Sequence, residues 1–208
     1  MTIFWFRRDL RLEDNTAFFH ALHGNDNVLP IFIFDENILQ HLEKNDARVT
    51  FIHNELEKMN LELIKINKSL AVFHGKPIEI LKKLILENKI AKVYTNHDYE
   101  PYARKRDVAL NELFKENKIE FKTCKDQVIF EKSEITKDDG LPYVVYTPFS
   151  NKWKAKLKAN QLVNYPSETL LINITKHSYP FLSMQDIGFE ATNMQLPNYN
   201  ISEKLISE

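Results

Sequence analysis

Short apolar runs alternate with longer amphipathic stretches over the first 124 residues of the chain. Runs of this length, with many aromatic and β-branched side chains, are typical of buried strands. Five runs fit this description: Ile3–Phe6, Val28–Phe34, Leu70–His74, Lys92–Thr95 and Ile119–Cys124. Because Pro30 cannot donate a ladder hydrogen bond, we expect it to be the first residue of the second strand, with the regular strand starting near Ile31.

The stretches between these runs repeat apolar side chains every three or four residues, which indicates helices with one buried face. The clearest pattern extends from Asp46 to Ile66, and an earlier helix is capped by Asp14 or Asn15. Pro77 marks the start of a third helix. The fourth helix carries its apolar face on Ala103, Leu110 and Phe114.

Five strands separated by four helices favour a parallel sheet that is covered by helices on both faces. Right-handed crossovers restrict how such strands are ordered in the sheet. We therefore predict an α/β fold with a doubly wound five-stranded parallel sheet of order 3-2-1-4-5, flanked by helices and followed by an extended C-terminal linker.

The alternation of apolar runs and amphipathic stretches ends after residue 124. Thr147-Pro148 predicts an N-cap with proline at the first helical position, opening a helix. The apolar face of this helix comprises Phe149, Trp153 and Leu157. Residues 160–200 show little periodicity, so we interpret them as the extended linker. Beyond it, Ile201 and Leu205 begin a new helical spacing.

Charge balance and cysteine content narrow the class of protein. Lysine and arginine number 28 against 29 acidic residues, so the basic excess of a nucleic-acid-binding domain is absent. Cys124 is the single cysteine, which excludes an internal disulfide and fits a reducing compartment. Arg7-Arg8 follows the first apolar run, the reverse of an export signal, and no run approaches the ~20 apolar residues of a membrane span. We therefore expect a cytoplasmic protein without a membrane partner.

Several common sites are excluded by the residues present. The chain has four glycines, so neither a GxGxxG nor a GxxxxGK[ST] motif can be written. His20 and His23 are three residues apart, but no third ligand lies at metal spacing, so no metal site is expected. No nucleophilic triad is indicated either, because one can be assembled only from scattered residues.

The predicted strand order brings together the loops that follow the first and fourth strands, residues 7–14 and 96–101. The first loop interleaves arginines with acids, which we interpret as a self-paired salt-bridge cluster in preference to the alternative of direct ligand contact. In the second loop, acids beside an aromatic ring favour a planar ligand with hydrogen-bond donors, against the alternative of solvated loop acids. Arg48 lies in the first turn of a helix and calls for an anionic ligand or, alternatively, a surface pair with Asp46 or Asp35.

Four segments of the sequence resemble the DNA photolyase/cryptochrome family, and they occur in the family's order. The longest is the string FWFRRDLRLEDN at residues 4–15. The others are Asp46–Ile52, Asn96–Asp107 and Tyr146–Trp153. Together they extend over most of residues 1–158, so we consider chance similarity implausible.

The resemblance implies the N-terminal antenna domain of a deoxyribodipyrimidine photolyase. Residues 1–130 would form the photolyase α/β antenna domain, 131–160 a domain-edge segment and helix, and 161–208 an interdomain linker with the start of a helical FAD domain. In complete family members that helical domain splits ultraviolet-induced pyrimidine dimers by blue-light-driven electron transfer from reduced FAD. We thus expect no catalytic residue in this chain and no lyase activity from it alone.

The same resemblance implies partners and a second chromophore. The partners would be the protein's own C-terminal FAD domain and, through the full-length protein, damaged DNA. An isolated domain would expose apolar surface and could dimerise without physiological meaning. The antenna chromophore would be a deazaflavin, FMN or a methenyl-folate. Its pocket, carried over by position, would use Ile33, Phe34, Asp35, Arg48, Asp98, Tyr99, Glu100 and Arg106.

Two alternatives stay open at this point. A cryptochrome photoreceptor fragment would share every motif quoted above. A stand-alone nucleotide-binding module would share the sheet, although the absence of a glycine-rich phosphate cradle counts against it. Repair by the full-length protein would distinguish the first alternative, and tight binding of ATP or AMP the second.

Overall fold

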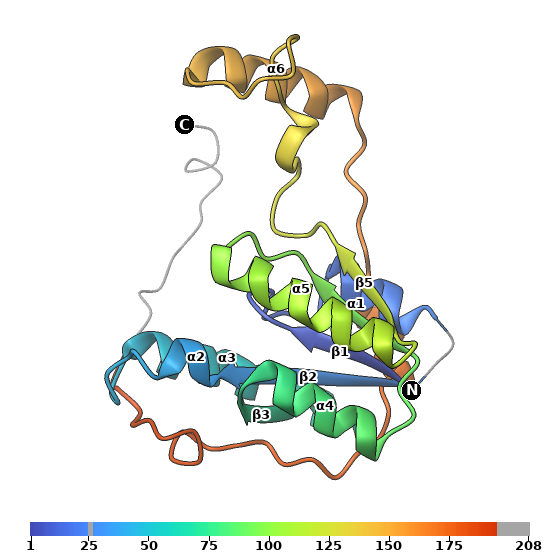
Figure 1. Ribbon diagram of the computed structural model, residues 1–208, viewed down its shortest axis with the longest axis vertical. Helices are drawn as coiled ribbons and strands as arrows, with labels where there is room; N and C mark the ends of the chain where they lie inside the picture. The colour runs from blue at the N-terminus through green and yellow to red at the C-terminus, as the bar shows by residue number, and fades with distance from the viewer. Residues whose placement is uncertain (25–26, 195–208) are drawn as a thin grey trace.

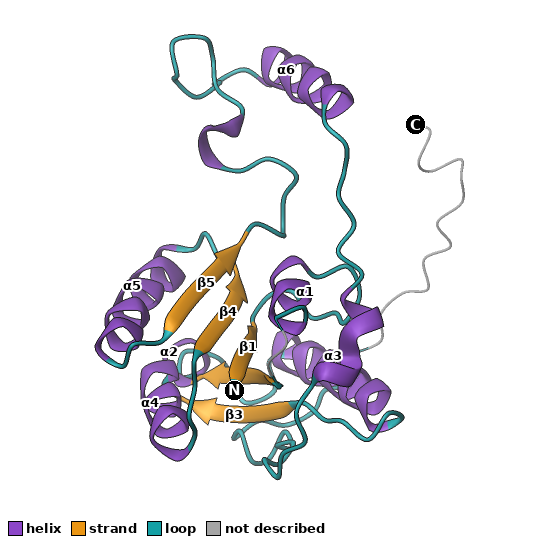
Figure 2. Ribbon diagram, turned by 90° about the vertical axis from the view of Figure 1, so that its right-hand side faces the viewer, coloured by secondary structure: helices purple, strands orange, loops and turns teal. Residues whose placement is uncertain are grey.

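Five parallel strands form one sheet in the order β3-β2-β1-β4-β5, as the sequence predicts (Figures 1 and 2). The computed structural model describes residues 1–24 and 27–194, so the predicted helical start at Ile201 and Leu205 lies outside the described residues. The strands are β1 (Thr2–Phe6), β2 (Val28–Asp35), β3 (Ala71–Gly75), β4 (Lys92–Asn96) and β5 (Glu120–Cys124).

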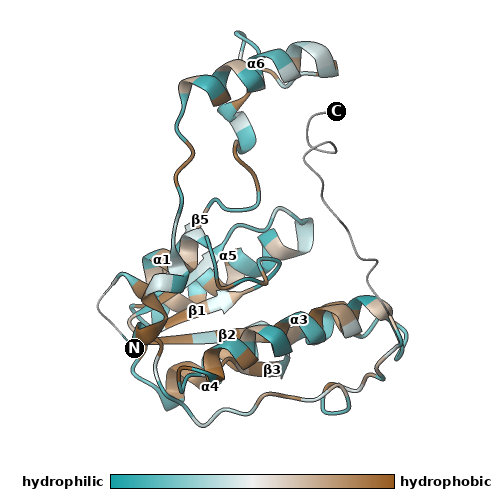
Figure 3. Cartoon of the chain, turned by 180° about the vertical axis from the view of Figure 1, so that it is seen from behind, coloured by the Kyte–Doolittle hydropathy of each residue, from teal (hydrophilic) through white to brown (hydrophobic). Residues whose placement is uncertain are grey.

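Helices cover both faces of the sheet, because alternate strand residues point to opposite faces and both sets are apolar. Phe4 and Phe6 pack with helices α1 (Thr16–Leu22) and α3 (Ala47–Ile64). Ile3 and Trp5 pack on the other face with α4 (Pro77–Glu87) and α5 (Pro101–Glu116). Figure 3 shows hydrophobic colouring on β1 and β2 of the sheet and on α4 of one helix layer. The two-layered core is therefore encoded within single strands.

The second strand begins earlier than expected. Pro30 lies inside β2, where it pairs with Phe4 of β1. Pairing with β3 starts only at Ile31, so at Pro30 the strand has a neighbour on the β1 side alone. A residue without a backbone N–H is tolerated where one side of the strand lacks a ladder partner. The short helix α2 (Glu36–Leu39) was not predicted either.

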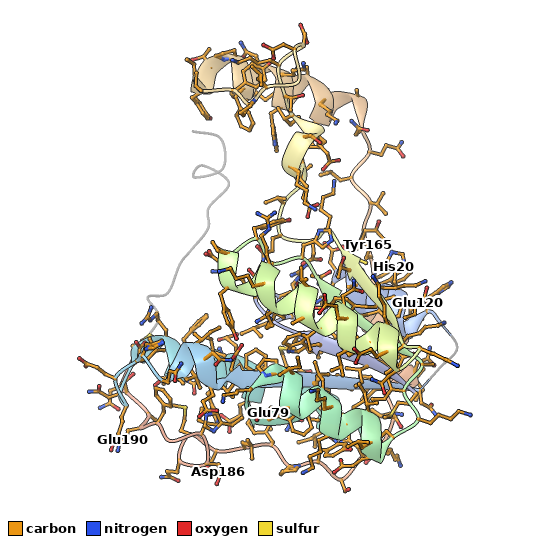
Figure 4. All side chains as sticks on the ribbon, viewed as in Figure 1. His20, Glu79, Glu120, Tyr165, Asp186 and Glu190 are labelled. Atoms are coloured by element: carbon orange, nitrogen blue, oxygen red, sulfur yellow. The ribbon has the colours of Figure 1, made fainter. Side chains whose placement is uncertain are left out.

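Residues 165–194, here called the C-terminal strap, run in extended form along the α/β body (Figure 1, orange to red). The strap contains the short helix η2 (Ser167–Asn173). At its start the rings of Tyr165 and His20 lie 5.3 Å apart between centroids (Figure 4). Farther on, the Thr175 amide donates to the Val28 carbonyl at 2.7 Å. The predicted linker is thus extended, and it packs against the sheet domain.

Helix α6 (Tyr146–Ala159) stands away from the sheet (Figures 1 and 2), and none of its residues is buried. It begins one residue before Thr147, and its N-cap, Val145, makes no side-chain cap hydrogen bond, so the predicted threonine cap is wrong. We call residues 141–163 the α6 arm. Its exposed apolar side chains are Leu141, Val144, Val145, Tyr146, Phe149, Leu162 and Val163. No helix of the described chain is long and apolar enough to cross a membrane.

Candidate functional site

A buried polar network joins the loop after β1 to the end of β4. The Asp9 carboxylate accepts hydrogen bonds from the Asn96 amide at 2.6 Å, the Asn15 amide at 3.0 Å and the Arg7 backbone N–H at 2.8 Å. Asp9, Asn15 and Asn96 are each at most 4% exposed. Asn15, one of the two predicted caps, also caps α1 by accepting from the Phe18 N–H. The network therefore fixes the two loops that the strand order was expected to bring together.

The arginines of the first loop pair with acids from distant parts of the chain. Arg7 binds both carboxylate oxygens of Asp107 at 2.8 and 2.9 Å. The remaining pairs are Arg8 with Glu100 at 3.3 Å and Asp98 at 3.7 Å, and Arg11 with Asp126 at 2.8 Å. The prediction of a self-paired cluster is therefore wrong. The fold supplies nearby acids from α5 and from the loops after β4 and β5, and these satisfy the guanidinium groups.

Arg106, from the first turns of α5, lies at the centre of the site with its side chain 10% exposed. Its nitrogens face three carboxylates at long range: Asp107 at 3.5 Å, Asp35 at 3.7 Å and Asp98 at 3.9 Å. Among the described residues, Nη2 of Arg106 is buried without a hydrogen-bond partner. A buried donor without a partner is costly. Arg106 thus has an N–H group available for an acceptor atom of a ligand or solvent.

Asp35 links the end of β2 to α5. The Tyr102 hydroxyl donates to one Asp35 oxygen at 2.7 Å, and the Asn37 backbone N–H donates to the other at 3.0 Å. Burial, together with the bond to Asp35, raises the pKa of Tyr102 to about 12. The tyrosine therefore stays a hydrogen-bond donor at neutral pH and keeps this carboxylate in position.

On the other side of the second loop, Glu131 accepts hydrogen bonds from the Tyr99 hydroxyl and from Nδ1 of His97. Burial and the neighbouring carboxylate raise the pKa of Tyr99. Burial works against ionisation of Glu131, but the bonds from Tyr99 and His97 outweigh it and keep its pKa below the usual range. A cavity of about 320 Å³ adjoins this cluster, and its lining includes His97, Asp98, Tyr99, Arg104 and Thr123.

The Glu131 contacts predict a pH dependence of stability. Because the folded-state pKa lies below the unfolded value of ~4.3, the stabilisation is complete above that pH and is lost as the pH falls through the folded pKa. Glu131→Gln should lower the unfolding free energy by about 1.5 kcal/mol at pH 7. It should also make the decrease of the unfolding free energy on acidification less steep. Urea unfolding between pH 7 and pH 3 would measure this. The exposed Glu57→Gln is the matched control, and an equally steep acid limb in Glu131→Gln would contradict the assignment.

The structure brings some of the predicted site residues together and separates others. Asp35, Asp98 and Arg106 meet, and Glu100 joins them through its pair with Arg8. Tyr99 contacts Glu131 instead.

The remaining predicted residues have other partners. Ile33 and Phe34 are 5% and 3% exposed and belong to the cores on opposite faces of the sheet. Arg48 pairs with Asp46 at 2.6 Å, and its side chain is 73% exposed. Within residues 1–24 and 27–194, no hydrogen bond or ion pair connects Arg48 to the other predicted positions.

Sequence reasoning missed several contributors to the site. Trp5 and Arg7 are two residues apart at the end of β1, a spacing that puts them on one side of the strand. Tyr102 and Arg106 are four residues apart on a helix, which also puts them on one face. These spacings are signals that could have identified both pairs. Glu131 lies in a stretch without periodicity, so no signal indicated it.

No cluster of three or more metal-ligating side chains occurs in the part of the chain that the structure describes. The available chemistry is hydrogen bonding and charge from arginine, aspartate and tyrosine side chains around a largely buried guanidinium. Such a set can bind the polar edge of a planar organic ligand, with Arg106 donating and carboxylates accepting.

Comparisons with known proteins agree with this architecture. The family model for DNA photolyase matches residues 2–168. The deoxyribodipyrimidine photo-lyase of Synechococcus sp. strain PCC 6301 is 31% identical over 156 residues, which cover 75% of this chain and 32% of that protein. Cryptochromes are also among the curated relatives. The chain spans about one third to two thirds of the length of the curated relatives it matches.

Two solved photolyases share the fold. The bacterial class III photolyase from Agrobacterium tumefaciens matches with a TM-score of 0.70 and 28% identity, covering 86% of this chain and 36% of that one. The archaeal photolyase from Sulfolobus tokodaii, described as having two FAD molecules with the implication of a novel light-harvesting cofactor, matches with a TM-score of 0.64 and 29% identity, covering 85% of this chain and 42% of that one. The chain belongs to the DNA photolyase family.

Proposed function

We propose that this chain is the light-harvesting domain of a photolyase and that it binds a planar antenna chromophore beside Arg106. The observation that carries the proposal is that the largely buried Arg106 guanidinium faces Asp35 and Asp98 and that its Nη2, like that of Arg7, has no hydrogen-bond partner in the described structure. A flavin or deazaflavin ring offers carbonyl oxygens and an N–H on one edge. Arg106 would donate to a carbonyl, and Asp98 would accept from the N–H.

The second FAD described for the Sulfolobus tokodaii photolyase supports a flavin as the chromophore class. A deazaflavin presents the same polar edge. A methenyl-folate is the third candidate, because its pterin ring also combines donors and acceptors. Titration of the chain with each chromophore distinguishes the flavin, the deazaflavin and the folate.

Dimer repair would belong to a longer polypeptide. Because the chain spans only about a third of the Synechococcus photolyase, we propose that FAD and damaged DNA bind to a C-terminal domain, and that electron transfer takes place there. The exposed apolar side chains of the α6 arm support a docking surface for that domain. The full-length protein would then be a deoxyribodipyrimidine photo-lyase in the cytoplasm.

The cryptochrome relatives favour a second candidate, a photoreceptor, which would bind the same chromophore without repair.

Fluorescence titration of the purified chain with FMN, FAD, a deazaflavin and methenyl-tetrahydrofolate tests the antenna site. We expect one class to bind and Arg106→Gln to weaken it by about 10- to 100-fold, the equivalent of one charged hydrogen bond. Lys105→Gln, at an exposed neighbouring position, is the matched control. Arg48→Gln decides whether Arg48 contributes. Failure of the wild-type chain to bind any of the four, or unchanged affinity in Arg106→Gln, would refute the proposal.

A further inference from the structure

The indole ring of Trp5 lies next to two guanidinium groups, both of which also contact Asp107. The Cζ atom of Arg7 is 4.8 Å from the ring centroid, and that of Arg106 is 4.7 Å from it. Trp5 lies on β1 and Arg7 comes directly after that strand, whereas Arg106 comes from α5. Trp5 itself is 2% exposed. Both cations are thus within the range of a cation–π interaction with one buried ring.

The two arginines differ in what else holds them. Arg7 binds both oxygens of Asp107 and donates from Nε to the Thr95 hydroxyl at 2.6 Å. Among the described residues, the carboxylates that face Arg106 lie at 3.5 to 3.9 Å, with Asp107 accepting a long hydrogen bond from Nε, and the Tyr102 ring lies 5.7 Å away. A flexible arginine beside acids ordinarily forms a close bidentate pair with one of them. Of the Trp5 and Tyr102 rings, the Trp5 ring lies closer to the Arg106 guanidinium.

We propose that Trp5 is a positioning residue for the antenna site. Its ring keeps the Arg106 guanidinium from rotating into a bidentate pair with Asp98 or Asp35, so that Nη2 remains free for the chromophore. The Trp5 ring also contacts Arg7, but Asp107 already fixes that guanidinium. The binding of a chromophore by Arg106 rests on the proposed function. The restraint of Arg106 by Trp5 is a property of the chain without ligand.

The ligand-free part of the inference can be tested by NMR of arginine side chains in the labelled chain. Ring currents from Trp5 should shift the Arg106 side-chain resonances upfield in the wild type. Trp5→Leu should remove that shift, and Trp5→Phe should reduce it. Phe4→Leu is the matched control, because Phe4 is equally buried on the same strand but packs on the opposite face. Arg106 resonances that are the same in wild type and Trp5→Leu would overturn the proposal.

The binding part uses the chromophore that the wild-type chain prefers. We expect Trp5→Leu to weaken binding by about tenfold and Trp5→Phe by less, because an aromatic face is retained. Combining Trp5→Leu with Arg106→Gln should weaken binding no further than Arg106→Gln alone, since both changes remove one contact. A purely structural role predicts instead that Phe4→Leu weakens binding as much as Trp5→Leu does, or that the two effects add, and either result would overturn the proposal.

Thermal unfolding of each variant separates loss of fold from loss of positioning. If Trp5→Leu does not fold, Trp5→Phe decides through its reduced ring-current shift and its loss of affinity relative to Phe4→Leu. If the wild-type chain binds none of the chromophores, the proposed antenna function fails. The NMR comparison then still shows whether the Trp5 ring lies against the Arg106 side chain.

Discussion

Replacing Asn96 with leucine should lower the free energy of unfolding by about 3 to 5 kcal/mol, because it leaves buried polar groups without partners. The Asn96 amide donates to Asp9 at 2.6 Å and to the Asn15 side-chain oxygen at 2.8 Å. Its oxygen accepts from the Ala17 backbone N–H at 3.0 Å. Leucine supplies none of these bonds, so the Asp9 carboxylate would keep its burial and lose its shortest contact.

Urea unfolding followed by circular dichroism would measure the change. Asn54→Leu is the matched control, since Asn54 is exposed on α3 and its replacement should change stability by at most about 0.5 kcal/mol. Asn96→Leu should also disorder the loop that carries Arg7, so that chromophore affinity falls with stability. A loss below about 1 kcal/mol in Asn96→Leu would show that Asp9 obtains water or another donor when the amide is removed.

The sheet order was predictable because the apolar pattern of each strand is local. The run at Ile3–Phe6 is apolar at every position, which indicates burial on both faces and hence a central strand of a parallel sheet. The structure confirms this, with β1 between β2 and β4. What the pattern does not contain is the exact strand start. At Pro30 the outcome depends on how far β3 extends, and that is a tertiary property.

The side-chain contacts of the site were much less predictable than its location. The strand order correctly indicated that residues 7–14 and 96–101 meet. It could not indicate that Arg7 pairs with Asp107, which lies 100 residues farther along the chain. Arg7 has acidic residues close to it in sequence, so local pairs were available. Its pair with Asp107 forms because the packing of α5 brings Asp107 next to it. The same reasoning explains why Arg11 binds Asp126.

The C-terminal strap shows a second kind of limit. Residues 165–194 lack periodicity because their contacts are made one residue at a time along the sheet domain. Ile174 is 1% exposed, Ile187 1% and Phe189 7%, and all three belong to the core that includes α1 and α3. An isolated apolar residue in an aperiodic stretch looks the same in sequence whether it is buried or exposed. Ile172, two residues before Ile174, is 70% exposed.

Combining Ile174→Ala, Ile187→Ala and Phe189→Ala should therefore abolish cooperative unfolding. Each truncation of a buried side chain costs about 2 to 5 kcal/mol. The three together exceed the lower end of the ~5 to 15 kcal/mol by which a typical domain is stable. Differential scanning calorimetry would show a lost or strongly lowered transition, with Ile174→Ala alone giving an intermediate shift. Ile172→Ala is the matched control and should leave the transition within about 2 °C of the wild type. A triple variant that melts like this control would mean that the strap is not part of the domain's core.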